Sequence, residues 1–230
     1  MCRSGFVPLS VLVAVSLMPL FLNGPNVNAE DLTRQAGYVK GEFVYEDAPF
    51  PQCHASTIEE TPGGLVIALF GGTHEKNDDV GIWVSRHADG KWTAPVEVAN
   101  GVVNDELRYP TWNPVLFQTP GKELILFYKM GPSPRDWWGR LVRSTDNGRS
   151  WSKWEQLPDG ILGPIKNKPL LLQDGTLLAG SSTEHDGWRV HMERATALGH
   201  EWSKTGALNT KAEMGAIQPT ILRFGDTLRI

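Results

Sequence analysis

The sequence predicts an all-β fold made of repeated four-stranded units, and three observations lead to this prediction. Apolar runs alternate with turns at regular intervals, one turn sequence recurs in weaker copies, and the composition favours turns over long helices. The 230 residues include 24 Gly and 16 Pro, residue types that commonly mark turns. Repeats of about 40–50 residues built from short strands are typical of a β-propeller.

The inner half of each unit consists of an apolar segment, a turn and a second apolar run. The second runs begin at Leu65, Leu124, Leu177 and Leu228, at intervals of 59, 53 and 51 residues. Each pair is predicted to form a hairpin of two strands, A and B, because turn residues separate the apolar runs. The four A segments are Ser56–Glu59, Pro114–Phe117, Pro169–Leu172 and Pro219–Leu222.

The outer half of each unit contains a turn whose best copy, Ser144 to Trp151, reads Ser-x-Asp-x-Gly-x-x-Trp. The Ser and Asp side chains can hydrogen-bond the backbone of their own turn, and Gly supplies a positive φ. The Trp can fold back on the hairpin as an apolar plug. Weaker copies end in Trp92 and Trp202, the latter with Ala197 in place of the Asp. This turn is expected to join two outer strands, C and D.

The fourth unit stops at Ile230, inside its strand B, so about three and a half four-stranded blades are present. A propeller has to close on itself, because open inner strand edges invite pairing with other chains. We therefore expect residues 30–230 to be an incomplete propeller domain from a longer protein.

Residues 1–29 have the pattern of a signal peptide. Arg3 precedes an apolar run from Phe6 to Leu22, and Val27 and Ala29 offer small residues before a cleavage point. An uncleaved membrane anchor is the alternative, although the run is short for a span and contains two prolines. We expect a secreted or periplasmic protein without a membrane span after cleavage.

Composition and motifs exclude several kinds of partner. The formal net charge is −4, and no basic stripe is present, which argues against nucleic acid. No metal-ligand spacing, phosphate-binding glycine loop or nucleophilic serine elbow is found in the sequence. We therefore expect neither a cofactor nor a metal.

The order of the strands predicts which end of the blades binds ligands. Strands that run alternately up and down place the A–B and C–D turns at one end. The starts of the A strands and the B–C loops then meet at the other end, around the axis, where a ligand pocket is expected. Asp146, in the C–D turn, is thus expected to be structural.

Polar residues gather at this predicted axial end. His54 is a candidate acid or base because histidine titrates near neutrality, and Glu75 and Glu184 are candidate acid–base carboxylates. Each has a structural alternative, as a hydrogen-bonded strand or loop residue. The segment from Ser133 to Trp138 is a candidate sugar-binding flap. The candidate substrate-binding residues are Lys129 and Lys168 for a carboxylate, and Asn113 and Gln218 for hydroxyls, or for contacts between blades.

The turns resemble the bacterial neuraminidase repeat, or Asp box, of the sialidase superfamily. From Tyr38 to Ile230 the chain also resembles a bacterial "predicted neuraminidase" branch of that superfamily. This resemblance rests on an ordered set of segments: Cys53–Ser56, Gly71–Thr73, Trp112–Leu116, Phe127–Lys129, Gly163–Pro169, Ser182–Glu184 and Ile217–Pro219. It implies a six-bladed propeller that removes terminal sialic acid.

One element of the sialidase pattern is absent. Sialidases carry an Arg-Ile-Pro-type motif near the first blade, and its Arg helps to bind the carboxylate of sialic acid. The corresponding residues here, Phe50 to His54, contain no Arg. The other arginines and the Tyr–Glu nucleophile pair of the family would lie in later blades.

The resemblance implies a secreted sialidase-like glycoside hydrolase of the exo-α-sialidase type that acts on a terminal acidic sugar of glycans. Two alternatives remain open. One is a polysaccharide lyase or hydrolase directed at uronic acids, with His54 or a Tyr as the base. The other is a non-catalytic carbohydrate-binding propeller.

Overall fold

The computed structural model describes residues 36–196, 199–210, 212 and 214–230. It divides into two compact units, Met1–Glu42 and Phe43–Ile230, and the second contains all the strands described below. The predicted signal peptide, residues 1–29, lies outside the described residues. No helix in the described part of the chain has the length and apolar character needed to cross a bilayer.

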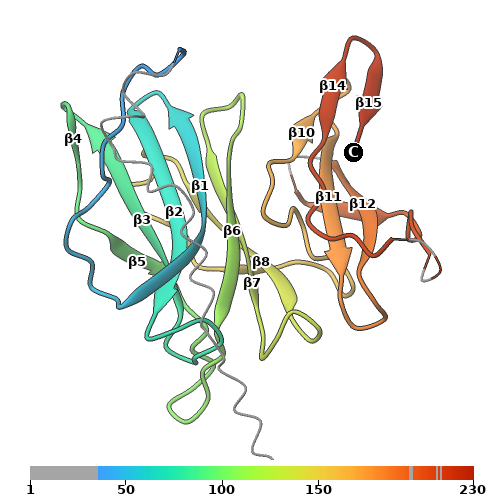
Figure 1. Cartoon of the computed structure of the whole chain (residues 1–230), viewed down its shortest axis with the longest axis horizontal. Helices are drawn as coiled ribbons and strands as arrows, with labels where there is room; N and C mark the ends of the chain where they lie inside the picture. The colour runs from blue at the N-terminus through green and yellow to red at the C-terminus, as the bar shows by residue number, and fades with distance from the viewer. Residues whose placement is uncertain (1–35, 197–198, 211, 213) are drawn as a thin grey trace, which may run out of the picture. The chain divides into compact units, whose positions relative to one another are not determined.

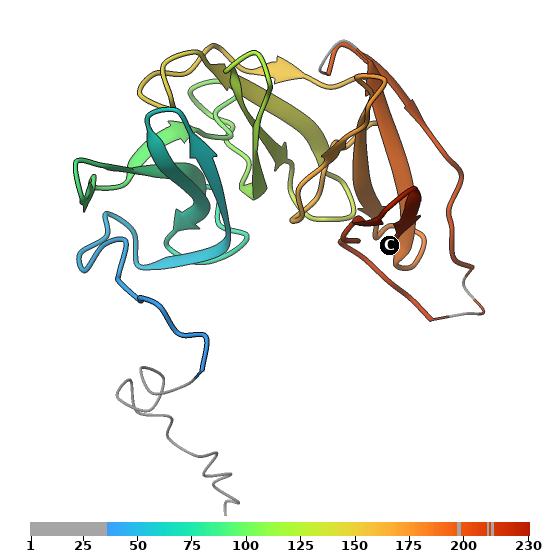
Figure 2. The same ribbon diagram turned by 90° about the horizontal axis from the view of Figure 1, so that it is seen from above.

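The second unit consists of antiparallel sheets that follow one another in chain order (Figures 1 and 2). The first contains β1 (Gln52–Thr61), β2 (Gly64–Gly72), β3 (Gly81–Ala88) and β4 (Lys91–Trp92), with β5 (Val96–Ala99) also paired to β3. The second contains β6 (Thr111–Gln118), β7 (Leu124–Met130), β8 (Trp138–Ser144) and β9 (Glu155–Gln156). The third contains β10 (Leu170–Leu171), β11 (Leu177–Thr183), β12 (Arg189–Thr196) and β13 (Glu201–Lys204), and a final hairpin contains β14 (Leu222–Phe224) and β15 (Thr227–Arg229).

These sheets confirm the predicted all-β fold of repeated four-stranded blades, with three blades and the first hairpin of a fourth in the described residues. The two later A strands are shorter than predicted. Pro169 lies outside β10, and Pro219 and Thr220 lie outside β14. Proline has no N–H to donate to a strand ladder, so it is confined to strand ends or to irregularities, and Pro114 accordingly lies at the register shift inside β6. The number of blades in a closed propeller stays a prediction.

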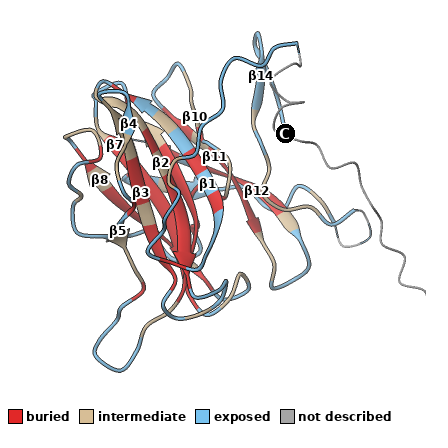
Figure 3. Ribbon diagram, turned by 60° about the vertical axis from the view of Figure 1, so that its left-hand side comes forward, coloured by how far each residue is buried: buried red, intermediate tan, exposed pale blue. Residues whose placement is uncertain are grey.

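The strand β7 shows how the blades pack together. All seven of its residues are buried, and successive side chains point to opposite faces. Leu124, Leu126 and Tyr128 pack in a cluster with residues of the first blade. Ile125 and Phe127 pack in a second cluster with residues of the third blade. A blade on each face thus explains why β7 is buried along its whole length. Figure 3 shows the buried residues concentrated in the long strands, such as β2, β3 and β7, whereas β14 and most loops are exposed.

The Asp-box turn after β8 has the predicted hydrogen bonds. Ser144 Oγ accepts from Gly148 N at 2.8 Å, and Asp146 Oδ1 accepts from Arg149 N at 3.0 Å and Ser150 N at 2.8 Å. Gly148 has a φ of 77°, as the turn requires. These donors hold the pKa of Asp146 well below its usual range, with the hydroxyl of Ser150 the largest contributor. The turn is therefore a closed, self-satisfied structure.

The tryptophans of these turns act as the expected plugs. Trp151 packs against the cluster shared by the first two blades, and Trp202 packs against the next cluster. The indole N–H of Trp202 donates to Gly199 O at 2.8 Å. Ala197, which replaces the Asp in this copy, lies outside the described residues.

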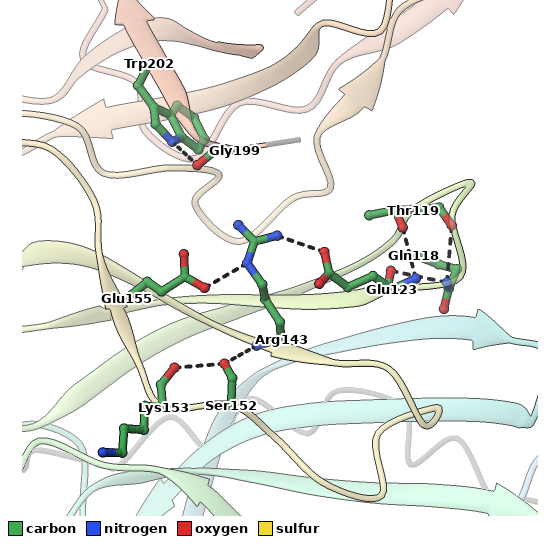
Figure 4. Close-up of polar contacts among 9 residues, drawn as sticks. All are labelled: Gln118, Thr119, Glu123, Arg143, Ser152, Lys153, Glu155, Gly199 and Trp202. Carbon is green, nitrogen blue, oxygen red and sulfur yellow. Dashed lines mark hydrogen bonds and ion pairs between the residues drawn. The ribbon is translucent and has the colours of Figure 1, made fainter. Parts of the chain in front are cut away.

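Arg143 ties together the strands that lead into the second Asp box (Figure 4). Its Nε donates to Glu155 Oε1 and its Nη1 to Glu123 Oε2, both at 2.8 Å. Its backbone N donates to Ser152 Oγ at 3.0 Å. One guanidinium thus links β8 to its outer neighbour β9 and to the A–B turn at the same end of the blade.

Candidate functional site

A cleft of about 480 Å³ lies where the chain enters its A strands and leaves its B strands. Its wall includes aromatic residues and two cations as well as residues predicted from the sequence. The predicted residues that line it are His54, Glu75, Asn113, Glu184 and Gln218. The others include Phe70, Trp112, Trp137, Lys76 and Arg135. Side chains from all four units thus meet at the end that the strand order indicated, and Ser133, Pro134, Arg135 and Trp137 of the flap segment are among them.

The starts of the A strands share an unusual backbone conformation. Ala55, Asn113 and Gln218 have φ values of 52°, 41° and 56°. In β1 and β6 these residues fall within register shifts, between His54 and Thr57 and between Trp112 and Val115. A bulge interrupts the alternation of a strand and re-aims its side chains. Positive φ is rare outside glycine and is concentrated at functional sites.

Asn113 and Gln218 line the cleft with amides that are not used elsewhere. Among the described residues, neither side-chain amide has a hydrogen-bond partner, although Asn113 is buried. The backbone of Gln218 holds the residue in place, because its N donates to Ser182 Oγ at 3.2 Å and its O accepts from Asn167 Nδ2 at 2.7 Å. The amides are therefore available to a ligand rich in hydroxyl groups.

His54 and Glu75 lie side by side at one wall of the cleft. His54 Nδ1 is 3.6 Å from Glu75 Oε2, and the two side chains are 70% and 48% exposed. The edge of the imidazole contacts Phe70, with 5.5 Å between the ring centroids. The separation exceeds a hydrogen bond, but catalytic pairs commonly tighten only when substrate binds. The pair can hold or pass a proton at the mouth of the cleft.

Glu184 is partly buried at the wall formed by the third blade. Burial raises the pKa of its carboxyl, while the positive charge of Arg135 acts in the opposite direction. A raised pKa keeps the carboxyl protonated to a higher pH than an exposed glutamate. This environment suits a carboxylic acid that donates a proton.

The two predicted lysines lie elsewhere. Lys129 is fully buried, and its Nζ donates to Pro164 O at 2.9 Å. Lys168 pairs with Glu59 Oε2 of β1 at 2.6 Å. We expected Lys129 in a B–C loop, but β7 continues to Met130 and keeps the lysine inside the protein. Both ammonium groups are bonded within the protein, and neither lysine lines the cleft.

Lys129 belongs to a buried charged cluster with Glu193 and His191, which we call the Glu193 cluster. Glu193 Oε1 accepts from Leu162 N at 2.9 Å, and its Oε2 accepts from Gly163 N at 2.6 Å. His191 Nε2 lies 2.9 Å from Oε1. Burial lowers the pKa of Lys129 to about 7, and the charge of Glu193 opposes this change. No local sequence pattern indicated this cluster, because its members come from different blades.

The segment between the second and third blades connects this cluster to the cleft. The Glu193 cluster fixes its start, at Leu162 to Pro164. Two residues on, Lys166 Nζ donates to Ser56 O of β1 at 3.1 Å, and Asn167 Nδ2 donates to Gln218 O. The segment thus contacts the A-strand starts of the first and fourth units, where cleft residues lie. The cluster supports the cleft without forming part of it.

Metal ligands are not grouped in the described residues, which contain no set of three or more His, Cys, Asp and Glu arranged to hold an ion. The polar groups that line the cleft are carboxyl, imidazole, amide, hydroxyl, ammonium and guanidinium groups.

Repeated four-stranded sheets, with an Asp-box turn between two outer strands of the same sheet, define a propeller-type protein of the sialidase superfamily. The chain belongs to the BNR repeat-like domain family, whose sequence pattern matches residues 63–230. This confirms the resemblance found in the sequence. A search of curated proteins gave no significant match.

Solved structures show the same fold. A protein of unknown function from Dyadobacter fermentans aligns with a TM-score of 0.59 at 14% identity, over 75% of this chain and 59% of that one. The Hadza microbial sialidase Hz136 aligns with a TM-score of 0.61 at 14% identity, over 74% of this chain and 39% of that one. Trypanosoma rangeli sialidase in complex with sialic acid aligns with a TM-score of 0.54 at 15% identity, over 79% and 34%. The chain thus spans less than two thirds of the length of these proteins.

Proposed function

We propose that the protein is a sialidase-like glycoside hydrolase that acts on a terminal acidic sugar of glycans, in a secreted or periplasmic location. The observation that carries this proposal is the cleft, where two carboxyl groups, an imidazole and two unpartnered amides gather beside aromatic rings. Sugars are bound by such mixtures, because amides pair with hydroxyls and aromatic faces cover the ring. The family and the fold shared with sialidases support the assignment.

In this proposal Glu184 is the general acid. Cleavage of a glycosidic bond needs a proton on the leaving oxygen, and a carboxyl whose pKa is raised by burial keeps that proton to a higher pH than an exposed glutamate does. Asn113 and Gln218 hold the sugar hydroxyls. His54 and Glu75, which line the same cleft, assist a water molecule in reaching the anomeric carbon. The location proposal rests on the pattern of residues 1–29.

Lyase or hydrolase action on a uronic-acid linkage is the second candidate. It is favoured by the exposed His54–Glu75 pair, because elimination needs a base that removes a proton next to the sugar carboxylate. A propeller that only binds carbohydrate is the remaining alternative.

The test is a screen of the full-length protein against sialosides and uronate oligosaccharides, with product analysis. We expect release of a free acidic sugar, and a loss of kcat of at least about 100-fold in Glu184→Gln. Glu201→Gln, an exposed glutamate of β13 that does not line the cleft, is the matched control and should retain activity. Absorbance from an unsaturated product would favour the lyase. Glycan binding without turnover of any substrate would contradict both enzyme proposals.

A further inference from the structure

Two cations line the cleft, Arg135 and Lys76, and neither side chain forms a hydrogen bond or ion pair within the described residues. Two arginines elsewhere show the alternative, because specific acceptors hold them. Arg143 contacts two glutamates, and Arg189 donates to Asn209 O at 2.7 Å. Unlike Arg143 and Arg189, Arg135 therefore keeps its N–H donors available for a ligand in the cleft.

The loop that carries Arg135 is anchored on both sides by one residue, Trp112. The indole N–H of Trp112 donates to Gly131 O at 3.0 Å, where the loop begins. The ring of Trp137, where the loop ends, packs against Trp112 with 6.0 Å between the centroids. Gly131 is needed there, since an added Cβ would lie 2.6 Å from the Cα of Trp137. Arg135 therefore projects from a short segment between two fixed points.

Hydrogen bonds inside the loop leave the guanidinium free. Arg135 N donates to Ser133 Oγ at 3.2 Å, and Ser133 Oγ pairs with Asp136 Oδ2 at 3.1 Å. The one carboxylate of the loop is thus engaged by the serine. The charge of Arg135 acts on Glu184, another residue of the cleft, whose carboxyl it stabilises in the ionised form.

We propose that Arg135 binds the carboxylate of the sugar in this cleft and thereby makes the site selective for acidic sugars. The inference rests on the proposed function. A guanidinium offers two parallel N–H donors to a carboxylate, which fixes the orientation as well as the charge of the ligand. Lys76, the other cation of the cleft, offers only a point charge.

Binding of the carboxylate also has a consequence for Glu184. The charged and titratable groups that line the cleft are His54, Glu75, Lys76, Arg135 and Glu184. A substrate carboxylate on Arg135 neutralises the charge that favours ionised Glu184, and it adds a negative charge nearby. Both changes favour the protonated form of Glu184, which is the form that acts as an acid.

The test compares an acidic glycoside with its neutral methyl ester in Arg135→Gln. We expect kcat/KM for the acidic glycoside to fall about 10- to 100-fold, with a much smaller change for the ester. Arg135→Lys should recover part of the loss, because it restores the charge but not the two-pronged geometry. Arg149→Gln is the matched control, since Arg149 lies in the Asp-box turn at the other end of β8. The melting temperature of Arg135→Gln should stay unchanged, because the side chain has no bond to lose.

The outcomes separate this inference from the proposed function. Equal losses on the two substrates, no loss on either, or selectivity lost in Lys76→Gln instead would overturn the role of Arg135. If the wild-type protein cleaves no glycoside, the proposed function fails, and titration with sialic acid, glucuronate and glucose becomes the test. Binding of the two acids that is weakened about tenfold or more by Arg135→Gln would then support the inference. Failure of the wild-type protein to bind either acid would refute it.

Discussion

The cleft and the Glu193 cluster contain the same kinds of residue in opposite situations. In the Glu193 cluster the carboxylate accepts two backbone N–H groups and contacts His191, and none of its charged side chains is exposed to solvent. In the cleft, His54 and Glu75 are half-exposed or more and lie beyond hydrogen-bond distance of each other. Within the described part of the chain, the Arg135 guanidinium has no hydrogen bond or ion pair.

Burial and pairing therefore distinguish charged groups that stabilise this fold from charged groups that can bind a ligand. A buried charge has to be fully paired, because an unpaired one costs several kcal/mol. Its bonding groups are then committed to the fold. A charge at the mouth of a cleft keeps its bonding capacity for a ligand while water solvates it. Substitutions in the two regions should therefore change different quantities, stability in one and activity in the other.

The largest effect on stability is expected for Glu193→Ala. It leaves the N–H groups of Leu162 and Gly163 and the ring of His191 buried without their acceptor. Loss of one partner of a buried charged network costs about 3–5 kcal/mol. Urea unfolding of the full-length protein measures this cost. A change below about 1 kcal/mol would show that the cluster is not the rigid support that we describe.

Lys129→Met should have a smaller effect, and one that depends on pH. The variant leaves Pro164 O without its donor, which costs about 1–2 kcal/mol near neutral pH. Burial lowers the pKa of Lys129 from 10.5 in an exposed lysine to about 7 in the fold. Between these values the unfolded chain binds more protons than the native one, so the stability of the wild-type protein increases with pH.

Methionine cannot titrate, so the difference in unfolding free energy between wild type and Lys129→Met should widen above pH 7. The expected slope is at most about 1.4 kcal/mol per pH unit. Unfolding curves of both proteins at pH 6 and pH 9 measure it. A difference that stays constant would mean that the lysine keeps its proton when buried.

The sequence was sufficient to predict the blades and the end at which the cleft lies. The four hairpins and the Asp-box turn are local features, set by turn residues and by apolar runs that are close in the chain. Strand order then placed His54, Glu75, Asn113, Glu184 and Gln218 at one end, and all five line the cleft. Their roles in binding or catalysis stay predictions.

The burial of Lys129 and the backbone conformation at the cleft were not predicted. They depend on contacts between blades, and residues that are close in the sequence do not reveal such contacts. Lys129 was expected to bind substrate because it follows a predicted strand B and would then lie on the axial rim with Lys168. It is buried because β7 extends further and Glu193, in the next blade, supplies an opposite charge. The positive φ of Asn113 and Gln218 was not predicted either. Proline after each of them was the one available sign of an unusual backbone.

The smallest effect on stability is expected for Glu75→Gln in the cleft. Glu75 Oε2 lies 3.6 Å from His54 Nδ1, and the side chains of His54 and Glu75 are 70% and 48% exposed. Exposed ion pairs of this kind contribute about 0–1 kcal/mol to the free energy of unfolding. We expect unfolding free energies of wild type and variant to agree within about 0.5 kcal/mol, while kcat on a cleaved substrate falls because the proposed His54–Glu75 pair loses its carboxylate. Measuring kcat and the unfolding free energy on the same variant is decisive, since loss of a functional charge changes the first and leaves the second unchanged. A loss of stability comparable to that of Glu193→Ala would place Glu75 with the structural charges and would remove the distinction between the two regions.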